Sequence, residues 1–205
     1  MRGATMQWEA SASSRLFRKH LELVPSAALL RSTSVIRYER NSVFPVHAHP
    51  GGQEILVLEG AFADEHGDYQ MGTFLLNPPG FCHTPLSNEG CLLFVKEAQY
   101  SGATRICTDS AHAEWVEEGD PGRQVIELFA GGTENIRLTR LDKGTHIPIH
   151  EHLGGNEMFI LQGTIEDEYG CYGVGDWIRS PAGSVHEPWT EEGCILYVKD
   201  GHLFG

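Results

Sequence analysis

The chain has 205 residues, of which 40% are hydrophobic, and this is enough for one large or two small domains with buried cores. Its 28 acidic residues outnumber its 15 basic residues, so the formal net charge is −13. An acidic surface repels phosphate backbones and anionic lipids, which excludes nucleic acids and membranes as expected partners. The first ten residues lack the apolar run of a signal peptide, and no stretch is long enough to cross a bilayer, so we expect a cytoplasmic protein.

The predicted elements are mostly short strands, because 24 glycines and 10 prolines supply many turns. Near the start of the chain, Ser13–Leu23 is the one candidate helix, since a proline two residues later would end it. Apolar runs separated by glycine turns and acidic loops then predict strands, among them Glu54–Leu58, Thr73–Leu76 and Leu92–Val95. The polar segment Ala98–Ala113 is predicted to connect two halves of the chain. This spacing is typical of an all-β protein.

The two halves of the chain are copies of one another. When the sequence is shifted by 103 residues, His47–Lys96 aligns with His150–Lys199 without a gap, and 22 of the 50 aligned positions are identical. A match of this length indicates a duplicated domain. We therefore predict two tandem domains, residues 1–105 and 106–205.

Each copy contains three histidines and a glutamate at spacings that suit a shared site. Residues two apart in a strand project to the same face, so His47 and His49 are expected to point into one space. A Gly-Gly turn follows and reverses the chain, so Glu54 on the next strand is expected to face the pair. Further along, a glycine- and proline-rich turn leads into His83. The second copy repeats the set as His150, His152, Glu157 and His186.

This combination of residues predicts metal binding. Three neutral imidazoles and a carboxylate suit a borderline divalent ion such as zinc, iron, manganese, nickel or copper, whereas calcium and magnesium prefer oxygen ligands. A single His-x-His motif is more often a surface or core pair than a ligand set. Here the motif is accompanied by a glutamate and a third histidine, and the whole set recurs. Without a cation, such a buried group would be strongly destabilising, so the sequence predicts two metal ions per chain.

Other repeated polar residues receive structural interpretations. The acidic pairs Asp64-Glu65 and Asp167-Glu168 lie between predicted strands, where we expect solvated hairpins. Lys96 and Lys199 end the last matched strand of each copy, and we expect their ammonium groups to lie in solvent. None of these residues is assigned to the predicted site.

The motifs resemble the two sequence signatures of the cupin superfamily. The first has a glycine, five residues, His-x-His, three or four residues, a glutamate and a later glycine; the second has a glycine, five residues, Pro-x-Gly, two residues and a histidine. The second copy opens the first signature with Gly144, whereas the first copy has Asn41, which also adopts left-handed turns. One departure is that five residues, not six, separate Glu54 from Gly60. The resemblance implies two tandem antiparallel jelly-roll barrels, that is, double-stranded β-helices of the cupin type.

The shorter hairpin between Glu54 and Gly60, the acidic pair and the terminal Gly-Cys are similar to a narrower group, the cupin domain at the C-terminus of ChrR-type anti-sigma factors. This resemblance implies that His47, His49, Glu54 and His83 hold one metal ion and that the matching residues of the second copy hold another. Zinc is the first candidate, with iron, manganese and nickel as alternatives. In those regulators a zinc-binding helical domain that contacts the sigma factor precedes the cupin. The first forty residues here show no His-x3-Cys-x2-Cys pattern of such a domain.

Two functional hypotheses from different classes follow. In the first, the chain is a ChrR-like sensor in which the metal shapes a pocket for a small molecule or an oxidant, with a regulatory protein as partner; a closed four-ligand zinc shell would suit that role. In the second, the chain is an iron- or manganese-dependent dioxygenase or decarboxylase of a diketone or carboxylic acid, with open metal positions for its substrate. A purely structural or storage bicupin is a third interpretation, which two retained ligand sets disfavour.

The duplication also bears on assembly and on the equivalence of the two sites. It mimics the symmetric dimer that single cupins form, so we expect the barrels to pack as a pseudo-dimer. The sequence does not decide whether two such chains form a further homodimer. The sites differ in their surroundings, because Thr84 and Leu86 of the first copy are replaced by Glu187 and Trp189 in the second. One site is therefore free to be catalytic while the other is structural.

Overall fold

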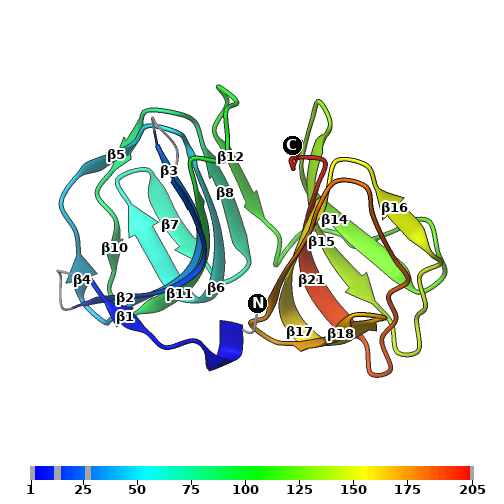
Figure 1. The fold of residues 1–205 in the computed structure, drawn as a ribbon. Helices are drawn as coiled ribbons and strands as arrows, with labels where there is room; N and C mark the ends of the chain where they lie inside the picture. Colours follow the sequence, from blue (N-terminus) through cyan, green and yellow to red (C-terminus); the bar gives the residue numbers. More distant parts are fainter. Residues whose placement is uncertain (1–2, 12–14, 26–28, 204–205) are drawn as a thin grey trace. The chain divides into compact units, whose positions relative to one another are not determined.

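The computed structural model describes residues 3–11, 15–25 and 29–203, and nearly all regular structure in them is β-strand (Figure 1). The chain divides into two compact units, one formed by Met6–His112 and the other by Ala113–Gly205 together with Met1–Thr5. A single 3₁₀ turn, η1 (Gly3–Thr5), is the only helical element among the described residues. In this part of the chain no helix has the length and apolar character needed to span a membrane.

The first unit is a double-walled antiparallel jelly roll. Its strands are β1 (Glu9–Ala10), β2 (Leu16–Pro25), β3 (Leu30–Tyr38), β4 (Ser42–Val43), β5 (His47–His49), β6 (Gln53–Asp64), β7 (Gly67–Gln70), β8 (Thr73–Asn77), β9 (Phe81–His83), β10 (Leu86–Ser87), β11 (Cys91–Glu97) and β12 (Ile106–Asp109). One wall is hydrogen-bonded in the order β1-β2-β3-β11-β6, and β8 and β12 continue it beyond β6. In the other wall β7 and β10 pair with the distal part of β6, and β4 pairs with β10. β5 and β9 form a separate two-stranded pair.

Strand β6 belongs to both walls because it carries a β-bulge. Its pairing with β11 skips Leu58, which is therefore the extra residue. A bulge bends the strand and reverses the alternation of its side chains. Val57 before the bulge and Phe62 after it consequently face the same core, although one number is odd and the other even. The second copy repeats the bulge at Leu161.

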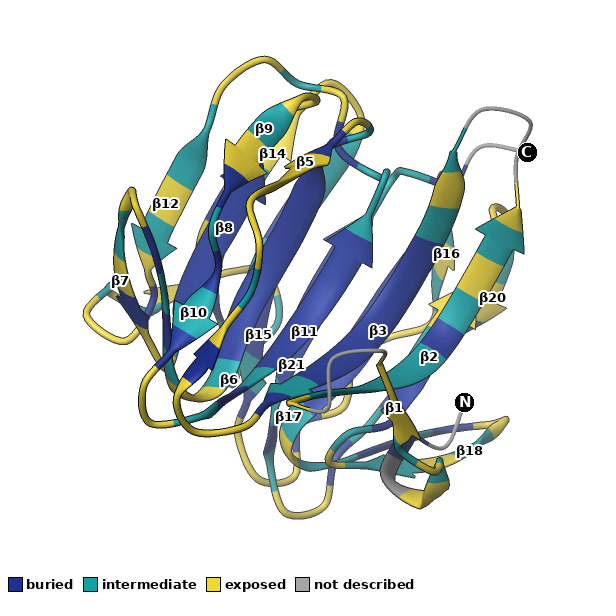
Figure 2. Cartoon of the chain, turned by 90° about the vertical axis from the view of Figure 1, so that its left-hand side faces the viewer, coloured by how far each residue is buried: buried dark blue, intermediate teal, exposed yellow. Residues whose placement is uncertain are grey.

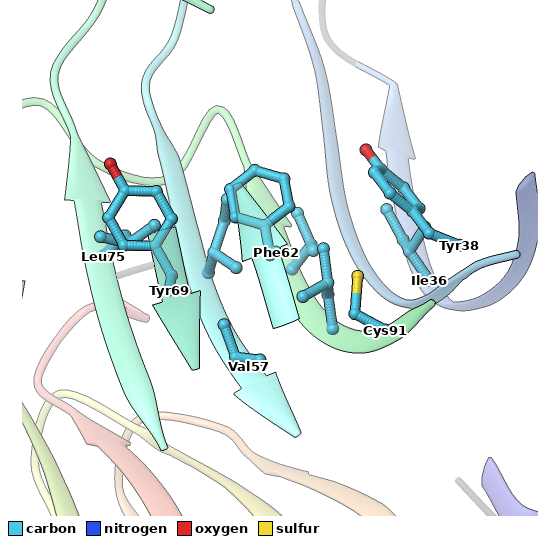
Figure 3. Close-up of a cluster of buried hydrophobic side chains, with 10 residues drawn as sticks. Ile36, Tyr38, Val57, Phe62, Tyr69, Leu75 and Cys91 are labelled. Atoms are coloured by element: carbon cyan, nitrogen blue, oxygen red, sulfur yellow. The ribbon is translucent and has the colours of Figure 1, made fainter. Parts of the chain in front are cut away.

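The core of the first unit lies between the two walls (Figure 3). Its buried members are Ile36, Tyr38, Ile55, Val57, Phe62, Tyr69, Leu75, Cys91, Leu93 and Val95. Phe62 of β6 stacks on Tyr69 of β7, with ring centroids 5.7 Å apart. Figure 2 shows β3 and β11 as almost continuously buried, whereas much of β1 and β12 is exposed or intermediate. Apolar burial between two walls is thus what closes the barrel, as expected for the predicted jelly roll.

The second unit repeats this architecture, which confirms the predicted fold of two antiparallel cupin barrels. Its strands are β13 (Val116–Glu117), β14 (Arg123–Gly131), β15 (Glu134–Leu141), β16 (His150–His152), β17 (Asn156–Asp167), β18 (Gly170–Gly173), β19 (Trp177–Ser180), β20 (Ser184–His186) and β21 (Cys194–Asp200). The order in its main sheet is β13-β14-β15-β21-β17, with β18 and β19 also paired to β17, while β16 pairs with β20. The core contains Leu141, Met158, Ile160, Ile165, Cys194, Leu196 and Val198.

The predicted helix over Ser13–Leu23 is wrong. Ser13 lies outside the described residues, and the described part from Leu16 onward belongs to β2, which pairs along its length with β3. The ladder is irregular between His20 and Glu22, and this irregularity lets the side chain between them be fully buried. Extended pairing with a neighbouring strand therefore outweighs the local helical spacing of the apolar residues.

The predicted solvation of Lys96 and Lys199 is also wrong, since both side chains are fully buried. Lys96 Nζ donates to Thr33 Oγ1 at 2.9 Å, and Lys199 Nζ lies 2.9 Å from Glu134 Oε1. Each lysine lies in a strand that has a neighbour on both sides. Polar groups of an adjacent strand therefore replace water as partners of the ammonium group.

The predicted domain boundary lies between residues 105 and 106. The strand that follows it, β12, pairs with β8 of the first unit through four residues, Ile106–Asp109. The two compact units divide after His112. The connecting segment thus contributes a strand to the first barrel before the chain enters the second.

Candidate metal centres

Two short strand pairs bring the predicted histidines of each copy together. β5 pairs antiparallel with β9, and His47 lies directly opposite His83. Because His49 is two residues from His47, the three imidazoles project from one face of the pair. β16 and β20 repeat this arrangement, with His150 opposite His186. We call His47, His49 and His83 the first triad, and His150, His152 and His186 the second triad.

The imidazoles of each triad converge through their Nε2 atoms. In the first triad, Nε2 of His49 and Nε2 of His83 are 3.0 Å apart. In the second, His186 Nε2 lies 2.9 Å from His152 Nε2 and 3.2 Å from His150 Nε2. In both triads one ring nitrogen of every histidine lies within 4.8 Å of those of the other two.

The other ring nitrogen, Nδ1, faces a hydrogen-bond acceptor in all six histidines. In the first triad the acceptors are Pro45 O at 2.9 Å from His47, Glu97 Oε2 at 2.9 Å from His49 and Asp64 Oδ2 at 3.1 Å from His83. In the second they are Pro148 O at 2.9 Å from His150, Asp200 Oδ1 at 3.3 Å from His152 and Asp167 Oδ2 at 3.3 Å from His186. Carbonyls and carboxylates only accept, so Nδ1 carries the proton and Nε2 presents a lone pair.

Three lone pairs directed at one another repel unless a cation lies between them, so the donor set fits a divalent transition-metal ion. The Nε2 separations of 2.9, 3.0 and 3.2 Å are short enough for these imidazoles to contact one ion. Burial lowers the pKa of His186. The hydrogen bond to Asp167 opposes this shift, and the nearby His152 adds to it. That imidazole is accordingly neutral, the form that binds metal.

Asp64 and Asp167 are part of these sites, so the expectation of solvated hairpins is wrong for them. Both are buried, because the bulge earlier in the same strand turns them inward. Asp64 also accepts from the Tyr69 hydroxyl at 3.0 Å and the His66 amide at 2.8 Å. Burial alone would raise the pKa of Asp64, but the hydrogen bonds from His83, His66 and Tyr69 hold it below its ordinary value. The carboxylate therefore stays ionised behind the imidazole.

Two further carboxylates, which we did not predict, support the second histidine of each triad. Glu97 and Asp200 occupy matching positions, 103 residues apart, and this acid in both copies is the signal by which they could have been found. Asp200 Oδ2 also pairs with the Arg137 guanidinium at 2.6 Å. Burial alone would raise the pKa of Asp200, but His152, Arg137 and Asn156 lower it to about 2.

The two predicted glutamates are not brought to the triads. Glu54 and Glu157 are buried in β6 and β17, and each precedes a residue that faces the barrel core, namely Ile55 and Met158. Since side chains alternate along a strand, the glutamates lie on the opposite face. Glu157 Oε1 lies 3.2 Å from His202 Nε2 there. Among the described residues, the metal-ligand groups consist of histidines only.

Directly before each of these glutamates, an amide side chain occupies the inward-facing position of the strand. Gln53 and Asn156 follow the second triad histidine after three residues, the shorter of the two spacings in the cupin signature. Gln53 Nε2 donates to Glu97 Oε1 at 2.9 Å, and its Oε1 accepts from Asn77 Nδ2 at 3.2 Å. Asn156 Nδ2 donates to Asp200 Oδ1 at 2.7 Å. A neutral amide therefore occupies the inward-facing position from which a carboxylate could reach the triad.

A cavity lies beside each triad. The second has a volume of about 560 Å³ and is lined by all three triad histidines together with polar residues that include Arg137 and Thr139. The first is smaller, about 340 Å³, and its lining includes two triad histidines with Ile36 and Tyr38. Both triads are thus accessible to a small molecule, and the second cavity is the roomier.

Comparison with known proteins places this arrangement in a family. A family model described as the ChrR cupin-like domain matches residues 1–101 and again 103–204. No curated protein matches the chain. Similar solved structures are a candidate dioxygenase from Nostoc punctiforme (14% identity, TM-score 0.78, covering 99% of this chain and 82% of that one), AerE from Microcystis aeruginosa (14%, 0.68, 95% and 97%) and oxalate decarboxylase from Bacillus subtilis (10%, 0.69, 99% and 76%).

At these identities the solved structures show a common fold and nothing more. The family match is stronger, because it covers both copies almost completely and coincides with the two barrels that carry the triads. The chain is therefore a bicupin that belongs to the ChrR cupin-like family.

Proposed function

We propose that the chain is a metal-dependent enzyme of the dioxygenase class that acts on a small molecule, with one divalent ion held by each triad. One observation carries this proposal: three nitrogens converge beside an open cavity, while the two glutamates expected to complete the shell face away. A three-nitrogen site leaves coordination positions for water, substrate or oxygen, whereas a closed four-ligand site does not.

In the second barrel His150, His152 and His186 would hold the ion, which supplies Lewis-acid or oxygen-activating chemistry when bound. Asp167 keeps the proton on Nδ1 of His186, and Asp200 does the same for His152, so both imidazoles present Nε2 to the ion. Three neutral nitrogens suit zinc, iron, manganese or nickel, and of these iron and manganese suit oxygen chemistry.

A second candidate function is ChrR-like sensing, which the family match over both copies favours. In this proposal the triads hold zinc, the cavity takes up a small molecule or an oxidant, and a regulatory protein is the partner. It uses the same ligands but predicts no turnover.

Elemental analysis of the natively purified protein tests the shared part of both proposals. We expect close to two metal ions per chain, and we expect the paired substitutions His49→Ala and His152→Ala to remove nearly all of that metal. The matched control is His112→Ala with His146→Ala, since these two histidines are exposed and lie outside the triads. Substantial metal in the first double variant would contradict the assignment.

Oxygen consumption separates the two functions. The iron- or manganese-loaded protein is screened with diketones and carboxylic acids, and the double variant serves as the blank. Turnover that depends on the triads supports the enzyme. Native zinc without turnover of any substrate would favour the sensor instead.

A further inference from the structure

The cavity beside the second triad is lined by three residues that carry buried polar atoms without hydrogen-bond partners among the described residues. These atoms are Arg137 Nε, Thr139 Oγ1 and Asn156 Oδ1, and all three residues line the cavity. Thr139 is 5% exposed and Asn156 is 1% exposed, so protein atoms cover most of both residues. Buried polar groups are normally paired, so three unpaired atoms on residues that line one cavity are the basis for placing a ligand there.

The hydrogen bonds already made define what each atom still needs. Asn156 uses its Nδ2 to donate to Asp200, so the free end of the amide is an acceptor that requires a hydroxyl or another donor. Arg137 is held by Asp200 Oδ2 at 2.6 Å and by Asn135 Oδ1 at 2.7 Å. Its Nε remains as a charged donor, which suits a carboxylate oxygen. The Thr139 hydroxyl can either donate or accept.

The carboxylate of Asp200 connects these atoms to the second triad. Asp200 bonds His152 through Oδ1 and Arg137 through Oδ2. The register places Asn156 opposite Asp200 on one neighbouring strand, while Arg137 lies on the other neighbouring strand, β15. A ligand that pairs with Arg137 and Asn156 therefore lies beside the second triad.

The first barrel lacks this set of atoms. At the positions 103 residues earlier, Ser34 replaces Arg137 and Ile36 replaces Thr139. The amide oxygen of Gln53 is already paired with Asn77, unlike that of Asn156. Among the described residues lining the first cavity, Arg18 Nε is the one buried side-chain atom without a hydrogen-bond partner. The two cavities thus differ in the chemistry that they offer a ligand.

We infer that the second cavity binds a small hydroxycarboxylate. Its carboxylate pairs with Arg137, and its hydroxyl pairs with Asn156 and Thr139. This inference rests on the proposed function, because the ligand lies against the open side of a metal ion held by the second triad. An analogue without the hydroxyl leaves both Asn156 Oδ1 and Thr139 Oγ1 unpaired, so the site discriminates against it.

Calorimetric titration of the metal-loaded chain with succinate, malate and tartrate tests the inference. These three acids share a carbon skeleton and two carboxylates, and they differ in having no, one or two hydroxyls. We expect malate or tartrate to bind at least ~10-fold more tightly than succinate, with one molecule per chain. Thr139→Val should reduce this preference to less than ~3-fold while metal content is unchanged. The matched control is Ile36→Val at the corresponding position of the first barrel, which should retain the full preference.

The site is assigned to a barrel with triad variants. His152→Ala should abolish the preferred binding, whereas His49→Ala should leave it. Equal affinities for the three acids, no binding of any of them, or an unchanged preference in Thr139→Val would overturn the inference while the proposed metal centres stand. Loss of the metal centres themselves would appear separately, as the absence of triad-dependent metal in the native protein.

Discussion

At the scale of single residues, buried carboxylates determine which nitrogen of each histidine is available. Asp64 and Asp167 accept from Nδ1 of the last histidine in each triad, so Nε2 is left as a lone pair. An ionised partner also makes the imidazole a stronger base toward a metal ion. The acid is therefore part of the proposed metal centre, although it lies behind the imidazole and not among the proposed ligands.

Replacing this acid should weaken metal binding. In Asp64→Asn the amide oxygen can still accept from His83, but the negative charge is lost, and we expect the first centre to bind metal ~10–100-fold more weakly. Competition with a chromophoric chelator measures the change. The control is Glu65→Gln, because this neighbouring carboxylate is exposed and points to the amide of Thr84. An affinity in Asp64→Asn equal to that of the control would contradict the role assigned to the acid.

The sequence was sufficient to place the histidines and insufficient to place the acidic residues. His47 and His49 share a face because side chains alternate along a strand. The same motif recurs in the second copy, so its spacing is not a coincidence. Gln53 and Glu54 are a different case, because the cupin spacing allows three or four residues and the choice depends on the Gly-Gly turn, where Gly52 has φ 74°. Asp64 faces inward only because of the bulge, which leaves no mark in the alternation of the sequence.

At the scale of elements, the bulged strands β6 and β17 connect the two walls of each barrel. Gly163 follows the bulge in β17 with φ 71°, and a Cβ at this position would lie 2.0 Å from Gly193 O. No side chain fits such an approach without movement of the backbone. The bend, the inward turn of Asp167 and the support of His186 consequently depend on this glycine.

Gly163→Ala should therefore destabilise the second barrel by roughly 2 kcal/mol or more, since it adds a backbone clash to the strain of a positive φ. The matched control is Gly144→Ala, because Gly144 has φ 77° but no heavy atom lies within 4 Å of the place that an added Cβ would take. That substitution should cost only about 1 kcal/mol, the strain of the conformation. Urea unfolding measures both, and equal costs would show that the close approach to Gly193 does not matter.

The elements that resisted prediction are those whose structure depends on distant partners. Strand β2 carries apolar residues at helical spacing, and only its ladder with β3 makes it extended. Strand β12 lies in a polar connecting segment, yet it pairs with β8. Local sequence patterns do not predict either of these strand pairings. The strands with Gly turns and recurring motifs, such as β6, were predictable because both copies show the same pattern.

At the scale of the whole molecule, duplication produces two units that each possess a core, a triad and a cavity. The duplication itself was evident from the constant shift of 103 residues. The sequence predicted that the surroundings of the two sites differ, but it did not identify Arg137 and Thr139, because they lie in a hairpin outside the gapless stretch of strong identity. A chain built this way can specialise one barrel while the other retains the same fold.

Separate cores and separate triads imply separate stabilisation by metal. An ion that binds only the folded state at about 1,000 times its Kd contributes ~4 kcal/mol, which for a domain of this size corresponds to a rise in Tm of more than ~10 °C. Calorimetry of the metal-loaded protein should therefore show two unfolding transitions, and a chelator should lower the Tm of both. In His83→Ala, chelation should move only the transition of the second unit, and in His186→Ala only that of the first.

Comparing each variant with and without chelator removes the effect of the substitution on packing, since both samples contain the same side chain. If chelation moves both transitions in His83→Ala, the ion in one barrel stabilises the other, and the units unfold cooperatively. If it moves neither transition in the wild type, the triads do not hold stabilising ions. The predicted outcome, one transition per triad, follows because the ladders of β11 with β6 and of β21 with β17 each close a barrel within a single unit.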